Sequence, residues 1–126
     1  DFEQAKRDLA AARAKMEDGI VLWIAPEGTR SRTGRMGSFK KGGFVMAVDS
    51  GATIIPMGIR GSEKVLPPKT LDFVLDQRIT INIGAPIEAS DYTLENKEDL
   101  MEAVRVAIAR LCGEAGEMAE TEAVAD

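Results

Sequence analysis

The chain has 126 residues, enough for one small domain, and a net charge of −5 from 16 basic and 21 acidic residues. It contains no histidine and a single cysteine, Cys112. These counts exclude, for this chain alone, a serine–histidine–aspartate triad, a cysteine–histidine pair, a histidine-rich zinc site and an internal disulfide. The longest apolar stretch, 20–26, is far shorter than the roughly 20 residues that span a bilayer. Because the chain begins with aspartate rather than methionine, we expect it to be part of a longer protein.

The first third of the chain predicts a helix, a strand and a loop. Apolar residues recur at three- and four-residue steps from Phe2 to Met16, which predicts an amphipathic helix ending at Gly19. The uninterrupted apolar run over residues 20–24 predicts a strand that is buried on both faces. Residues 26–38 are rich in glycine, serine, threonine and arginine, which is typical of a loop.

The middle of the chain predicts a short helix followed by a strand. Residues 42–50 are almost wholly apolar, and Gly51 stands where a helix favours a left-handed cap. Residues 53–59 predict the next buried strand, although Pro56 lacks a backbone donor and favours an edge or a bulge at its position. A further short strand is expected over residues 71–75.

The last third predicts a half-exposed strand and a long helix. Isoleucines alternate over residues 78–83, so one face of that strand is expected to be apolar. A helix is expected from Lys97, with Asn96 as its N-cap and an apolar stripe that includes Leu100 and Val104. The residues after Gly113 include five acids and no base, which indicates a disordered tail.

Alternation of helices and strands predicts an α/β fold with a mainly parallel or mixed sheet flanked by helices. We expect residues 1–113 to form one domain, incomplete at its N-terminus, and residues 114–126 to form the tail. Residues 24–64 hold seven basic and three acidic residues, a local charge of +4, while the remainder carries −9. A local basic segment in an acidic chain favours a small anionic ligand over nucleic acid, which needs a broad basic face. A solvated basic loop without a ligand is the alternative.

The predicted loop after residue 24 has the chemistry of a phosphate site. It follows a strand directly, and ligands of open α/β sheets bind at the carboxyl ends of strands. Arg30 and Arg32 offer planar forks of donors, Thr29 and Ser31 add hydroxyls, and Gly28 allows close approach of the backbone. Two lysines at 40 and 41 stand at the start of the next helix, whose positive dipole end favours the same anion. Without a Gly-Lys-Ser or Gly-Lys-Thr ending, the loop is not of the Walker type.

Three segments resemble the 1-acylglycerol-3-phosphate acyltransferase family, in the family's order and spacing. Residues 24–32, Ile-Ala-Pro-Glu-Gly-Thr-Arg-Ser-Arg, closely resemble its Phe-Pro-Glu-Gly-Thr-Arg-Ser block. Residues 37–42 are similar to the segment that follows this block, and residues 52–59 to a hydrophobic strand motif centred on proline. The resemblance covers residues 20–86, and it implies a glycerol-3-phosphate-acyltransferase-like fold.

The resemblance also implies an activity and a set of binding residues. The activity is transfer of a fatty acyl group from acyl-CoA or acyl carrier protein to 1-acylglycerol-3-phosphate (lysophosphatidate), giving phosphatidate, without a metal or redox cofactor. The parent protein is expected at a membrane, on the cytoplasmic face. Arg30 is the expected phosphate ligand, and Pro56 is expected either to shape a substrate pocket or to be a plain core residue. The full set implied for the substrate is Glu27, Gly28, Thr29, Arg30, Ser31, Arg32, Lys40, Lys41 and Pro56.

The chain departs from the family in lacking its general base. Family members carry a histidine and, after four residues, an aspartate upstream of these segments, and that histidine acts on the acceptor hydroxyl. We therefore expect no catalytic residue in this chain and no turnover by the chain alone. Two alternatives remain: a non-catalytic phosphate- or phospholipid-binding module, and an acyltransferase for another lysophospholipid or for glycerol 3-phosphate. A nucleic-acid-binding domain is disfavoured, because aromatic residues are not interleaved with the basic ones.

Overall fold

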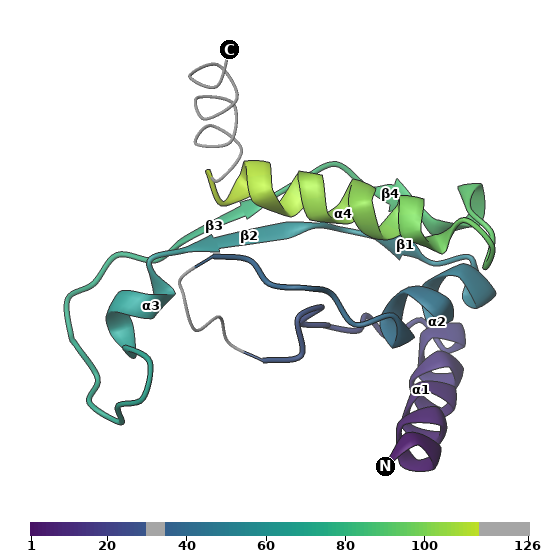
Figure 1. Ribbon diagram of the computed structural model, residues 1–126, viewed down its shortest axis with the longest axis horizontal. Coiled ribbons are helices and arrows are strands. Elements are labelled where there is room, and N and C mark those ends of the chain that lie inside the picture. The colour runs from purple at the N-terminus through teal and green to yellow at the C-terminus, as the bar shows by residue number, and fades with distance from the viewer. Residues whose placement is uncertain (30–34, 114–126) are drawn as a thin grey trace.

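The computed structural model describes residues 1–29 and 35–113, and it has the predicted α/β class (Figure 1). Its elements are α1 (Phe2–Glu17), α2 (Gly42–Ser50), β1 (Thr53–Ile54), β2 (Met57–Arg60), α3 (Ser62–Val65), β3 (Thr80–Ile83), β4 (Ile87–Glu88), the 3₁₀ helix η1 (Ala89–Asp91) and α4 (Lys97–Leu111). Strand β1 pairs with β4 and β2 pairs with β3, both antiparallel. The parallel pairing expected from the sequence is therefore absent from the described residues.

Helix α1 is held mainly by local interactions. The Asp1 carboxylate accepts the Glu3 N–H at 3.1 Å, which caps the helix, and Arg13 pairs with Glu17 at 3.4 Å. The helix meets the start of α2, where a Cβ on Gly42 would lie 3.2 Å from Leu9 Cδ1. No residue of α1 is fully buried, and Figure 1 shows the helix extending away from α2 toward the N-terminus.

The core lies where α2, η1 and α4 meet. Its buried members are Phe44, Ala47, Ala89, Leu100 and Val104, and Leu100 is completely buried. Helix α2 ends as predicted, because Gly51 adopts a left-handed conformation with φ of 63° and returns its N–H to the last turn. Helix α4 begins as predicted after Asn96. Its apolar stripe faces this core through Leu100 and Val104.

Strands β2 and β3 form a ribbon that α4 covers on one face (Figure 1). Contact on that face is close, since a Cβ on Gly58 would lie 2.5 Å from Leu111 Cβ. Asn82 also points there and donates its side-chain amide to the Leu111 carbonyl at 2.8 Å. The single buried strand expected over residues 53–59 is divided instead into β1 and β2, with Pro56 between them, and Ile55 and Ile59 are 46% and 38% exposed. The Pro56 carbonyl accepts the Gly84 N–H at 2.9 Å.

The buried strand predicted over residues 20–24 is not formed among the described residues. These residues join no ladder, and the side chains of Val21 and Trp23 are 93% and 68% exposed. A strand needs a hydrogen-bonded neighbour, and no described segment pairs with this one. Most of the apolar side chains that predicted a buried strand are therefore exposed.

The connection between β2 and β3 also differs from the prediction. The short strand expected over residues 71–75 is absent, and Leu71 and Leu75 are 90% and 79% exposed. The connection contains one helical turn, α3, directly after β2. The Val74 N–H donates to the Val65 carbonyl at 2.8 Å, so this excursion is closed by a backbone bond rather than by pairing with a sheet. The expected tail after residue 113 lies outside the described residues.

Candidate functional site

Two bonds fold the predicted phosphate loop back on itself. The Lys40 N–H donates to the Pro26 carbonyl at 2.7 Å. The Gly37 N–H donates to Glu27 Oε2 at 2.8 Å. Both ends of the loop are therefore joined, and the half-buried Glu27 carboxylate serves as an internal brace.

Gly28 forms the turn at the base of this loop. Its N–H donates to the Ala25 carbonyl at 3.0 Å, and its φ of +71° lies in the left-handed region that favours glycine. A Cβ at this position would also lie 3.4 Å from Lys40 Cγ. The lysine stem therefore runs directly beside the turn, and the structure brings Lys40 to the loop as the sequence analysis expected.

The other predicted binding residues fall in three places. Thr29 is exposed on the loop, next to Gly28. Arg30, Ser31 and Arg32 lie outside the described residues. Pro56 is buried directly before β2, beside Gly84, in a different part of the chain.

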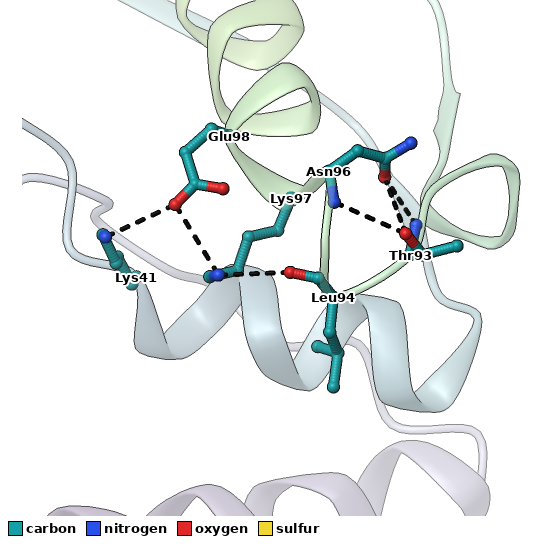
Figure 2. A network of polar contacts seen from close by, with 6 residues as sticks. All are labelled: Lys41, Thr93, Leu94, Asn96, Lys97 and Glu98. Atoms are coloured by element: carbon teal, nitrogen blue, oxygen red, sulfur yellow. Dashed lines mark hydrogen bonds and ion pairs between the residues drawn. The ribbon is translucent and has the colours of Figure 1, made fainter.

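Lys41 points to the start of α4. Its Nζ donates to Glu98 Oε1 at 3.4 Å, and Lys97 Nζ lies 3.6 Å from the same oxygen, as Figure 2 shows. Glu98 stands in the first turn of α4, where its own backbone N–H and then the Lys41 side chain lower the pKa of its carboxyl below the ordinary 4.5. The positive charge of Lys41 is thus shared with a carboxylate, which makes Lys40 the better placed of the two for an anion on the loop.

The N-cap of α4 differs in detail from the prediction. Asn96 occupies the cap position, but its side chain makes no capping bond to the helix. Its Oδ1 accepts instead from the Thr93 N–H at 2.7 Å and the Thr93 hydroxyl at 3.2 Å (Figure 2). The side chain therefore closes the preceding turn and sets the point at which the chain enters α4.

One residue at the site was missed by the sequence analysis. Arg105, on α4, donates to the Gly37 carbonyl at 2.6 Å and to the Met36 carbonyl at 3.4 Å. Its guanidinium also lies 5.7 Å from the centre of the Phe39 ring. The only sign in the sequence was a basic residue directly beside the apolar stripe of α4, and that pattern is also typical of a solvated helix face.

The described part of the site has features that suit an anion. It presents a glycine turn, a hydroxyl and a lysine around an open loop, features that suit a phosphate group. Among residues 1–29 and 35–113, no group of three potential ligands is placed to hold a metal ion. No helix in the described part of the chain is long and apolar enough to cross a membrane.

Comparison with known proteins identifies the class. Residues 1–60 match the family model described as Acyltransferase. A chloroplastic 1-acyl-sn-glycerol-3-phosphate acyltransferase of Arabidopsis thaliana is 35% identical over 75 residues, which are 60% of this chain and 21% of that protein. A 1-acyl-sn-glycerol-3-phosphate acyltransferase of Haemophilus influenzae is 34% identical over 89 residues, 71% of this chain and 36% of that protein.

A solved structure agrees with these sequence matches. The crystal structure of the 1-acyl-sn-glycerophosphate acyltransferase of Thermotoga maritima superposes with a TM-score of 0.76 at 28% identity, over 86% of this chain. The matches in sequence and structure confirm the resemblance to acyltransferases that was inferred from the loop. The chain spans 44% of the Thermotoga protein and about a fifth to a third of the curated relatives.

Proposed function

We propose that the full-length protein containing this chain transfers a fatty acyl group from acyl-CoA or acyl carrier protein to 1-acylglycerol-3-phosphate, producing phosphatidate. The observation that carries the proposal is the Glu-Gly-Thr-Arg loop, built on the turn at Gly28 and braced through Glu27. The relatives in Arabidopsis, Haemophilus and Thermotoga, which are named as acyltransferases for this acceptor, support the proposal.

Within this proposal, the chain supplies the acceptor-phosphate site. Arg30 is the main ligand, since a guanidinium offers two parallel donors to a phosphate. Thr29, Ser31 and the Gly28 backbone add hydrogen bonds, while Arg32 and Lys40 add positive field. Glu27 has a different role from direct binding, because one of its oxygens already accepts the Gly37 N–H. It holds the loop in the shape that the phosphate meets.

The proton chemistry is assigned to residues outside this chain. Acylation of the acceptor requires a base for the hydroxyl proton, and this chain contains no histidine. A histidine and an aspartate upstream are the proposed catalytic pair. The chain alone is then expected to bind acceptor without turning it over. Because both substrates carry acyl chains or acyl carriers, the full-length protein is proposed to work at a membrane surface, on the face where acyl donors are supplied.

Substitution of Arg30 tests the acceptor site. In the full-length enzyme, Arg30→Ala should raise the apparent KM for lysophosphatidate at least about 10-fold, because charge-assisted hydrogen bonds are worth roughly 1.5–3 kcal/mol. The KM for the acyl donor should not change. Arg7→Ala is the matched control, since Arg7 is an exposed arginine on α1 that bonds to its own helix. An unchanged KM for lysophosphatidate in Arg30→Ala would refute the phosphate role.

The choice of acceptor and the occurrence of transfer need a separate assay. Lysophosphatidate, another lysophospholipid and glycerol 3-phosphate should be offered in parallel with one acyl donor. Formation of phosphatidate at the highest kcat/KM supports the proposal. A higher kcat/KM with another acceptor would mean that the protein is an acyltransferase for that acceptor instead. Binding of lysophosphatidate without any acylated product would favour a binding module instead.

A further inference from the structure

We infer that Arg105 is a positioning residue for the acceptor site, acting from α4 through the peptide group between Met36 and Gly37. The inference deepens the proposed function and rests on it. Its starting observation is that Arg105 is 68 residues away from Gly37 in sequence, yet donates to the Gly37 carbonyl at 2.6 Å. Through this bond a helix of the core reaches the segment that closes the phosphate loop.

The contacts form a continuous chain from α4 to Glu27. The second donor of Arg105 meets the Met36 carbonyl at 3.4 Å, and the N–H of the same peptide group, that of Gly37, donates to Glu27 Oε2 at 2.8 Å. Hydrogen bonding at a peptide carbonyl polarises the group and strengthens its N–H as a donor. Arg105 therefore fixes the orientation of the Gly37 N–H, which braces Glu27, and makes it a stronger donor.

The guanidinium is itself held in place by an aromatic platform. It lies over Phe39, 5.7 Å from the ring centre, and the Phe39 ring stacks on Phe44 with centroids 6.0 Å apart and planes inclined by 11°. Phe44 is 6% exposed and belongs to the core. The fork of Arg105 is thus pre-oriented by the packed part of the molecule, which reduces the entropy lost in holding the loop.

The chemistry requires arginine rather than a generic cation. Two carbonyls on adjacent residues accept from two nitrogens of one planar group, and a lysine ammonium can only approximate that geometry. Among the described residues, Arg105 meets the loop segment at Met36, Gly37 and Phe39. The proposed route of its effect on the site therefore runs through Gly37 to Glu27.

Kinetics of the full-length enzyme separate this role from general stability. Arg105→Gln should raise the apparent KM for lysophosphatidate about 10-fold and leave the KM for the acyl donor unchanged. Arg105→Lys should fall between Arg105→Gln and wild type. The matched control is Arg110→Gln, which removes the same charge from an exposed position on the same helix and should leave both KM values unchanged.

A double substitution tests the route of the effect. Because Arg105 and Glu27 both act on the peptide group at Gly37, Arg105→Gln should add much less than 10-fold to the KM in a Glu27→Ala background, which lacks the acceptor for the Gly37 N–H. Additive effects would overturn the route, and equal KM values for Arg105→Gln and Arg110→Gln would overturn the inference. If Arg105→Gln fails to fold, Arg105→Lys decides by the same comparison. A wild-type enzyme that does not acylate lysophosphatidate would instead overturn the proposed function, independently of Arg105.

Discussion

Two apolar regions of the molecule differ in how deeply their side chains are buried. One is the contact of α4 with α2 and η1, and the other is the isoleucine face of the β2–β3 ribbon. On one side, Leu100 and Val104 are 0% and 3% exposed against α2 and η1. On the other, the ribbon turns its isoleucines outward, with Ile59, Ile81 and Ile83 exposed by 38%, 55% and 67%. The same helix thus seals one apolar region and leaves another open.

The difference shows that alternation of apolar and polar residues identifies the two faces of a strand but does not tell which face another element covers. In β3 the apolar face is open and Asn82 lies under α4, because Gly58 on the paired strand leaves room for the helix and Asn82 bonds its last turn. A face of isoleucines would hold the helix farther away. Close approach and one satisfied polar group have therefore decided the packing.

Truncation in the closed region should have the largest effect. Leu100→Ala should lower the free energy of unfolding by about 2–5 kcal/mol, because it removes a completely buried side chain and leaves a cavity. Urea denaturation followed by circular dichroism measures this change. Val106→Ala, on the same helix at 37% exposure, is the control and should cost less than about 1 kcal/mol. Equal costs would mean that the core is not where the structure places it.

The same truncation in the open region should have a smaller effect. Ile81→Ala should cost below about 1 kcal/mol in this chain, since the side chain is 55% exposed. Repeating both substitutions in the full-length protein sharpens the contrast. If Ile81→Ala there costs as much as Leu100→Ala, the isoleucine face is covered by another part of that protein, and the difference between the two regions belongs to this chain alone.

Local signals explain which elements could be predicted. The end of α2 at the left-handed Gly51 and the start of α4 after Asn96 lie where these residues predicted them. The break between β1 and β2 follows from the missing donor of Pro56. In contrast, β4 and η1 exist through pairing and packing with distant segments, so their own residues give no comparable signal.

The candidate site divides in the same way. The basic loop and the lysines that follow it could be predicted, because the residue types that suit a phosphate fall within one short segment, residues 27–41. The bond between Lys41 and Glu98 and the bonds from Arg105 to the loop could not be predicted, since they join residues 57 and 68 positions apart. Sequence spacing identifies which groups could bind a phosphate, and tertiary contacts decide which of them stay available.

The smallest expected effect is at the border between the closed region and the phosphate loop, at Glu98. The pKa of this carboxyl is lowered from 4.5, first by its own backbone N–H and then by Lys41, so the ionised form is favoured in the folded chain. A carboxyl with a lowered folded pKa adds stability at pH values above its unfolded pKa and loses that contribution as the pH falls through the folded pKa. Glu98→Gln should therefore be slightly less stable than wild type at pH 7 and equally stable well below pH 4.5.

Denaturation midpoints of the two proteins across this pH range, at low and high salt, measure the Glu98 effect. Salt should reduce the difference at pH 7, because the pair with Lys41 is exposed. Glu102→Gln, one turn along α4 and also exposed, is the control for loss of a carboxylate on this helix. A difference that persists unchanged at acid pH would show that Glu98 stabilises α4 by packing rather than by charge, and Lys41 would then be free to serve the loop.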